Sequence, residues 1–184
     1  MISPLLMNIA LHGLEEDLGE AYPKGQKPVV IRFADDVVIL HHDLDTLHQV
    51  KEHAETWLGH MGLELNPNKT RIAHTLNEDE GQAGFDFLGF NVRQYHVGRY
   101  KTRTYRGHAG FKTLIRPSKE AQRRHLAHLK QVICDYRGSS QGGLIGKLNP
   151  IIRGWANYYK TCVAKETFNR ISAQLYFKLR RWAA

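Results

Sequence analysis

Two adjacent carboxylates, Asp35 and Asp36, are the residues of this sequence whose types and spacing could do chemistry. They lie between two short β-branched runs, residues 29–31 and 37–40, each the length of one strand. Like charges at the tip of a hairpin repel, and a divalent cation removes that cost. A pair of cations about 4 Å apart can align a hydroxyl for attack on a phosphate. The pattern indicates metal-assisted phosphoryl transfer, with a plain acidic turn as the alternative.

Length and composition describe a chain that can build its own core. It has 184 residues, 42% of them hydrophobic, which suits one large domain or two small ones. No apolar run reaches the roughly 18 residues of a membrane helix. The apolar start of the chain has no basic region before it, so we expect no signal peptide. Cys134 and Cys162 form no paired motif and are expected to be reduced thiols of a cytoplasmic protein.

Charge is divided unevenly along the chain. Residues 1–91 hold 6 Lys and Arg against 15 Asp and Glu, a net charge of −9, whereas residues 92–184 hold 20 against 3, a net charge of +17. Aromatic residues are mixed into the basic half. A polyanion is the natural partner of such a segment, and stacking side chains among the cations favour nucleic acid. The alternative for each aromatic residue is a place in the core.

Hydrophobic periodicity and turn residues predict an α+β acidic half. The predicted elements are a helix over 3–17, the hairpin around Asp35, a helix over 43–61, a strand over 69–76, a surface loop over 77–84 and a strand over 85–92. The basic half is predicted to be mainly helical after a basic hairpin or extended loop over 93–110 and a strand over 111–115. Ser118 is predicted to cap the first of three helices, and Pro150 to kink or restart the second.

The predicted organisation has three parts. Residues 1–92 form a partial antiparallel sheet with helices, residues 93–117 form a basic connector, and residues 118–184 form a helical region.

Five motifs stand in one order along almost the whole chain. They occupy residues 2–9, 33–36, 62–70, 87–90 and 148–159. Their order and spacing closely resemble the reverse transcriptase/maturase proteins encoded by bacterial and organellar group II introns. The resemblance implies a partial polymerase palm in residues 1–92, then a thumb and an RNA-binding maturase domain. It also implies RNA-directed DNA polymerase activity and a place in the bacterial cytoplasm or an organelle.

The resemblance implies a catalytic set within the palm. Asp35 and Asp36 match the acidic pair of the family's catalytic box, with Asp35 a ligand of Mg²⁺ and Asp36 the second acid, in or beside the metal site. Phe33 stands where that box usually has tyrosine. Lys69 matches a lysine near the triphosphate that steadies or protonates the leaving pyrophosphate; the alternative is an ordinary surface lysine. Further positions match contacts to template and incoming dNTP, namely Ser3, Pro4 and Asn8, and the primer grip, namely Phe87, Leu88, Gly89 and Phe90.

The resemblance also implies RNA contacts in the basic half. The cations expected to bind intron RNA are Arg116, Lys119, Arg123, Arg124, Arg153, Lys160, Arg180 and Arg181. Trp155 and Tyr158 lie in the maturase signature, and helix–helix packing is favoured for both over base stacking.

One expectation concerns residues that this sequence does not contain. The family uses a further aspartate on an earlier palm strand, together with fingers, and the chain starts just inside the first motif. We therefore expect an incomplete two-metal site, no polymerisation by the chain alone, and an N-terminal palm and fingers fragment as a candidate partner in trans. Two alternatives stay open: a non-catalytic RNA-binding maturase remnant, and a pseudogene product that does not fold stably.

Overall fold

The computed structural model describes residues 3–23, 25–78, 83–97 and 110–183. The chain divides into two compact units, Met1–Ile72 and Ala73–Ala184, each with its own hydrophobic core. Helices and antiparallel strands occur in both, which confirms the predicted α+β class. The middle of the predicted basic hairpin, residues 98–109, lies outside the described residues.

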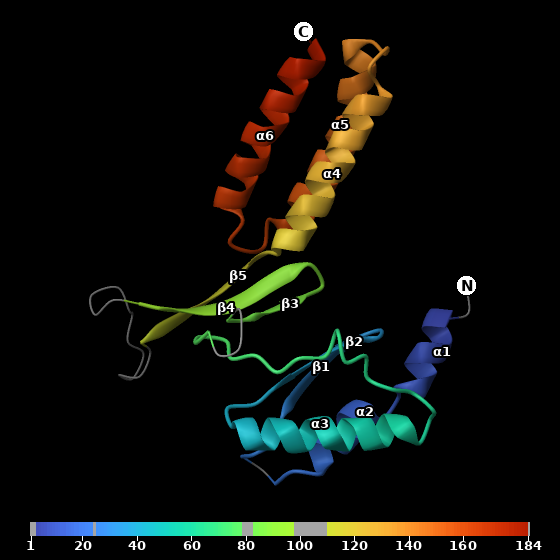
Figure 1. The fold of residues 1–184 in the computed structure, drawn as a ribbon, viewed down its shortest axis with the longest axis vertical. Helices are drawn as coiled ribbons and strands as arrows, with labels where there is room; N and C mark the ends of the chain where they lie inside the picture. Colours follow the sequence, from blue (N-terminus) through green and yellow to red (C-terminus); the bar gives the residue numbers. More distant parts are fainter. Residues whose placement is uncertain (1–2, 24, 79–82, 98–109, 184) are drawn as a thin grey trace. The chain divides into compact units, whose positions relative to one another are not determined.

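The first unit is built around a two-stranded hairpin (Figure 1). Its elements are α1 (Ser3–Ala10), α2 (Leu14–Glu20), β1 (Val29–Phe33), β2 (Asp36–Leu40) and α3 (Leu44–Gly59). Its core holds Leu14 and Leu18 of α2 and Val50 of α3, with Val30 and Ile39 of the hairpin packed against them. Strand alternation turns the other hairpin face outward, where Val29, Ile31 and Phe33 are between 44% and 62% exposed. The hairpin therefore has one packed face and one apolar face open to solvent.

Two predictions for the first unit are wrong. The single helix over 3–17 is two helices, because Gly13 takes a φ of 90° between them, a conformation that ends a right-handed helix. Residues 69–76 form no strand. Turns form at Asn66–Thr70 and at His74–Asn77 instead, and the His74 and Thr75 carbonyls accept single hydrogen bonds from the Gly84 and Gln94 N–H groups, both at 2.8 Å. The helix predicted over 43–61 is confirmed as α3, with Asp43 accepting a 2.8 Å hydrogen bond from the Thr46 N–H as its cap.

The second unit begins with a three-stranded antiparallel sheet in the order β3–β4–β5. The strands are β3 (Phe85–Phe87), β4 (Phe90–His96) and β5 (Phe111–Pro117). The single strand predicted over 85–92 is therefore wrong. Leu88 and Gly89, with φ values of 50° and 80°, form a two-residue turn that reverses the chain and pairs Phe87 with Phe90.

Three long helices complete the second unit (Figure 1). They are α4 (Lys119–Asp135), α5 (Gln141–Tyr159) and α6 (Lys165–Ala183). Ser118 caps α4 as predicted, with its Oγ 3.1 Å from the Ala121 N–H. α5 runs through Pro150 without restarting. The buried side chains between the helices include Leu129 of α4, Leu144 of α5 and Ile171 of α6.

The border between the compact units lies at Ile72/Ala73. The sheet β3–β5 contacts the three helices, so the predicted domain boundaries near 92 and 117 fall inside the second unit. The two compact units are defined by contacts within the chain and not by family relationship. The predicted boundaries between the three parts therefore stay predictions. No helix in the described ranges is long and apolar enough to cross a membrane. Cys134 and Cys162 are both free.

Candidate functional site

The acidic pair sits at the tip of the β1–β2 hairpin. Asp35 lies in the two-residue turn, and Asp36 is the first residue of β2, paired with Phe33. Both carboxylates are exposed. Ala34, the other turn residue, takes a φ of 55°, a left-handed conformation that costs an L-residue about 1–2 kcal/mol. A tight turn with this strain keeps both carboxylates at the hairpin tip, beside the exposed Phe33 ring.

These two carboxylates have the donor chemistry that Mg²⁺ prefers. Magnesium is usually bound by one or two carboxylates, with water and substrate phosphate supplying its other ligands. Within the described ranges, no group of three or more His, Cys, Asp or Glu side chains comes together. Asp35 and Asp36 stay the predicted ligands of Mg²⁺, and a two-metal centre would need a further carboxylate.

Arg32 connects the hairpin to the helices before it. Its Nε is 2.8 Å from Glu15 Oε1 of α2, and its Nη1 donates to Asn8 Oδ1 of α1 at 3.2 Å. Asn8 was predicted to contact template or nucleotide, so the structure brings one such residue to the strand that leads into the acidic turn. Sequence reasoning missed Arg32. The signal was available, because it is one of only 6 basic residues in the acidic half and lies inside an apolar strand.

The other predicted palm residues are not gathered at the acidic turn by any described interaction. Lys69 is exposed in the Asn66–Thr70 turn, where its N–H donates to the Asn66 carbonyl at 3.0 Å. Its ammonium forms no ion pair with Asp35 or Asp36 among the described residues. Ser3 and Pro4 form the first turn of α1. The catalytic role of Lys69 and the contact roles of Ser3 and Pro4 stay predictions.

The predicted primer-grip residues form the β3–β4 turn. Bulky residues rarely adopt a positive φ, so Leu88 at 50° is held there by its surroundings. The Gly89 carbonyl accepts hydrogen bonds from the Ser118 N–H at 2.8 Å and from the Tyr159 hydroxyl at 3.1 Å. The Leu88 carbonyl accepts one from the Tyr158 hydroxyl at 2.9 Å. Tyr158 and Tyr159 at the end of α5 and Ser118 directly before α4 therefore hold the turn by hydrogen bonds, and we call this set of bonds the clamp.

Aromatic packing supports this clamp. The Phe90 ring lies 5.1 Å from the Tyr158 ring and 4.9 Å from the Tyr159 ring. Tyr159 is buried, and burial raises the pKa of its hydroxyl, which stays a neutral donor. Tyr158 is 52% exposed. The sequence offered base stacking or core packing as the role of Tyr158, and neither includes the hydrogen bond from its hydroxyl to the turn.

Trp155 has the core position that was favoured for it. Its ring stacks on His125 of α4 at 4.6 Å and 10°, and contacts Tyr159 and Phe168 at 4.6 and 5.7 Å. Burial, helped by the nearby His128, lowers the pKa of His125 to about 4. His125 is therefore neutral at physiological pH and packs as a flat aromatic partner.

The cations predicted to bind RNA lie on the helices, directly after α5 and near the end of β5. All are exposed except the half-buried Arg116. Among the described residues only one of them pairs with a carboxylate, Arg124 with Glu120 at 3.8 Å. The Lys160 ammonium donates to Asn157 Oδ1 at 3.5 Å. In the described ranges the other six have no carboxylate partner, so their charge can attract a polyanion.

Comparison with protein families gives two matches. Residues 1–92 match the family described as reverse transcriptase (RNA-dependent DNA polymerase). Residues 122–184 match the family described as group II intron, maturase-specific domain. No curated protein matches the chain. Leu88 and Gly89 lie in the first matched segment and Tyr158 and Tyr159 in the second, so the hydrogen bonds of the clamp join the two.

Proposed function

Because these matches place the chain in the family of group II intron reverse transcriptase/maturases, we propose that it binds intron RNA through its second unit and supplies Asp35 and Asp36 to RNA-templated DNA synthesis. The observation that carries the RNA-binding part is the set of exposed cations on α4, α5 and α6, only one of which pairs with a carboxylate among the described residues. Counterion release from the RNA backbone makes such a surface bind tightly and with strong salt dependence.

The catalytic part rests on the acidic turn. Asp35 and Asp36 would hold one Mg²⁺, which neutralises phosphate charge when bound. The exposed turn lets the triphosphate of a dNTP reach both carboxylates. Lys69 is the proposed partner of the leaving pyrophosphate, and the Phe87–Phe90 turn is the proposed support of the primer end. Since a two-metal centre needs a carboxylate beyond this pair, the chain alone does not polymerise, and a palm and fingers fragment in trans is its proposed partner.

An RNA-binding experiment tests the first part. The probe is a transcribed group II intron RNA, compared with an unrelated RNA of equal length over a salt series. We expect binding that weakens as salt rises, falls in Arg123→Gln/Arg153→Gln, and is unchanged in Asp35→Asn/Asp36→Asn. The proposed RNA surface would be refuted if binding weakened in the aspartate variant and stayed unchanged in the arginine variant.

Primer extension tests the catalytic part. The purified chain is incubated with Mg²⁺, dNTPs and a DNA primer on an RNA template, alone and with a palm and fingers fragment from a group II intron reverse transcriptase. We expect no extension by the chain alone, and extension with the fragment that is lost in Asp35→Ala. Extension by the chain alone would refute the incomplete site. No extension in either case would favour the non-catalytic maturase remnant, for which the unpaired cations are the supporting observation.

A further inference from the structure

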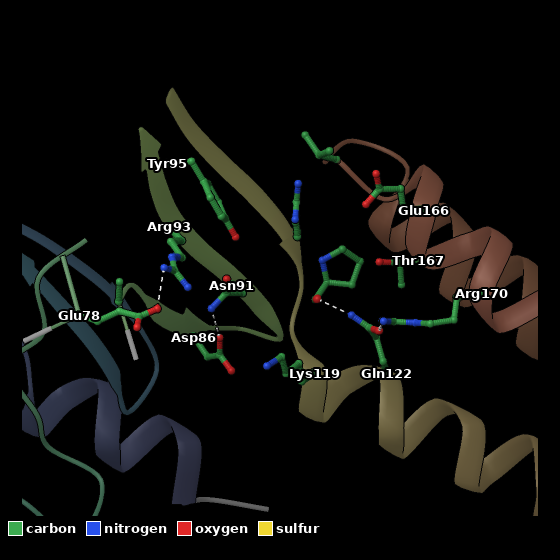
Figure 2. A pocket seen from close by; sticks show the side chains of 14 residues that line it. Glu78, Asp86, Asn91, Arg93, Tyr95, Lys119, Gln122, Glu166, Thr167 and Arg170 are labelled. Atoms are coloured by element: carbon green, nitrogen blue, oxygen red, sulfur yellow. Dashed lines mark hydrogen bonds and ion pairs between the residues drawn. The ribbon is translucent and has the colours of Figure 1, made fainter. Parts of the chain in front are cut away.

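A cavity of about 400 Å³ opens between the β3–β5 sheet and the first turns of α4 and α6 (Figure 2). Its strand side carries Asn91, Arg93 and Tyr95 of β4 and Arg116 of β5. Its helix side carries Lys119 of α4 and Arg170 of α6, among others. All of these residues belong to the second unit. The volume lies in the range of small-ligand pockets, roughly 300–1,000 Å³, and is far too small for a duplex.

Strand register explains why this face is polar. Asn91 pairs with Asp86 on β3 and with Arg116 on β5, which places the three side chains in one row across the sheet. Arg93 and Tyr95 follow on β4 at intervals of two and share that face. The opposite face carries Phe90 and Val92, which line a separate apolar pocket. One face of the sheet is therefore apolar, and the other face, on the side of the cavity, carries Arg93, Arg116 and Tyr95.

An aromatic ring and two guanidinium groups form the strand wall of the cavity. The Arg93 and Arg116 guanidinium carbons lie 5.1 and 5.3 Å from the Tyr95 ring centroid. Such contacts hold the flat groups in place while leaving their N–H donors available. Arg93 is also paired with Glu78 at 2.9 Å. Arg116 has no carboxylate partner among the described residues, so its charge is available to a ligand.

The helix side adds two more available cations. Lys119 forms no ion pair with any described residue. The Arg170 guanidinium donates to Gln122 Oε1, and the Gln122 Nε2 donates to the Pro117 carbonyl at 2.7 Å, as Figure 2 shows. This chain of hydrogen bonds orients Arg170 at the rim without neutralising it.

Among the described residues that line the cavity, the charges leave a positive surplus. Two acidic groups oppose the three available cations: Asp86, which accepts a 2.7 Å hydrogen bond from Asn91, and the exposed Glu166. Glu78 is already paired with Arg93. One phosphodiester carries one negative charge and so balances the surplus. The first turns of α4 and α6 add partial positive charge at the same place.

We propose that this cavity binds one nucleotide of a single-stranded RNA, with Arg116, Lys119 and Arg170 on its phosphate and the Tyr95–arginine stack against its base. Bases splayed from single-stranded RNA stack on aromatic rings and on guanidinium planes, both of which this wall offers. The inference rests on the proposed RNA-binding function and adds to it a defined site for an unpaired nucleotide.

Binding of a labelled twelve-nucleotide oligouridylate to the whole chain tests the site. Arg116→Gln/Lys119→Gln removes two cavity cations, and Lys130→Gln/Lys147→Gln removes two exposed cations outside the cavity as the matched control. We expect the cavity variant to bind at least about tenfold more weakly and to lower the salt slope by about 0.7, the contribution of one single-strand phosphate. We expect the control to stay within about twofold of the unsubstituted chain.

Substitution of the ring separates stacking from charge. Tyr95→Leu should weaken oligouridylate binding by about fivefold or more with an unchanged salt slope, because one stacked base is lost and no phosphate contact is. Tyr95→Phe keeps the ring and should bind as the unsubstituted chain does. Circular dichroism and thermal melting verify that each variant is folded. A 4-thiouridine probe should crosslink to the β4–β5 strands in the unsubstituted chain, a result that does not depend on any variant.

The outcomes separate this site from the wider function. If the unsubstituted chain binds intron RNA but the cavity variant matches its control, or crosslinks fall only on α5 and α6, the cavity proposal is wrong and the proposed function stands. If the cavity variant binds duplex RNA and oligouridylate more weakly by the same factor, the cavity is a general contact to the RNA backbone, and the proposal is also wrong. If the unsubstituted chain binds no RNA, both proposals fail.

Discussion

The hydroxyl of Tyr159 donates a 3.1 Å hydrogen bond to the carbonyl of Gly89, seventy residues earlier in the chain. The same tyrosine leaves no room at Gly89, since a Cβ built there would lie 2.6 Å from the Tyr159 hydroxyl oxygen. The end of α5 therefore both bonds the β3–β4 turn and limits what can occupy it. If that turn supports a primer, its position depends on the segment that matches the maturase-specific domain.

Removing the Tyr159 hydroxyl should weaken the second unit modestly. The Gly89 carbonyl keeps its 2.8 Å bond from the Ser118 N–H, so Tyr159→Phe leaves no unsatisfied acceptor. We expect the free energy of unfolding to fall by about 1 kcal/mol in urea denaturation. Tyr176→Phe is the matched control, because Tyr176 is 61% exposed and its hydroxyl bonds no described residue. Equal effects of the two substitutions would show that the clamp contributes no stability.

A side chain at Gly89 should destabilise the turn through two separate causes. Gly89→Ala forces an L-residue to a φ of 80° and places its methyl group against the buried Tyr159. We expect a loss of about 2 kcal/mol. In the Tyr159→Phe background the loss should be smaller, because the hydroxyl oxygen is gone, and a double-mutant cycle measures the difference. Gly146→Ala, in open space on α5, should instead stabilise the protein by about 0.5–1 kcal/mol.

Relief of strain at the acidic turn should stabilise the first unit. Ala34 holds a φ of 55° beside Asp35, and glycine adopts that conformation without the cost that a Cβ carries. We expect Ala34→Gly to raise the free energy of unfolding by up to about 1 kcal/mol, measured by urea denaturation followed through Trp57 fluorescence. Ala34→Val should lower it, because a β-branched residue tolerates positive φ least. A loss in the glycine variant would mean that the turn is not strained.

His125 predicts a pH dependence of stability in the second unit. Its pKa in the folded protein is about 4, below the usual value of 6.5, because burial disfavours the charged ring. The unfolded chain therefore binds the extra proton first as pH falls. Stability is full above pH 6.5 and is lost progressively as pH drops from 6.5 to 4, by about 3 kcal/mol. The melting temperature of the unsubstituted chain should fall as the pH drops over that range. His125→Phe, which keeps a ring on Trp155, should show a smaller fall in melting temperature. Parallel curves would contradict the assignment.

Local signals in the sequence were enough for several elements. The helical spacing of apolar residues predicted α3, and Ser118 predicted the start of α4, because periodicity and capping act within a few residues. The two β-branched runs predicted the hairpin that carries Asp35 and Asp36. The order of five motifs indicated the family that the two matches show.

Other features depended on contacts that no local pattern contains. Residues 85–92 read as one apolar strand, and distant residues hold Leu88 in the conformation that makes the turn, through hydrogen bonds from Tyr158, Tyr159 and the Ser118 N–H. Residues 69–76 had the composition of a strand, yet the described backbone bonds from β4 to this segment are limited to one, from the Gln94 N–H to the Thr75 carbonyl, and a strand needs a continuous ladder. The charge of Arg93 and Arg116 was evident in the sequence, but the register of β4 with β5 placed both beside Tyr95 in one cavity. Residue types determined the chemistry this protein offers, and long-range pairing decided which of those residues meet.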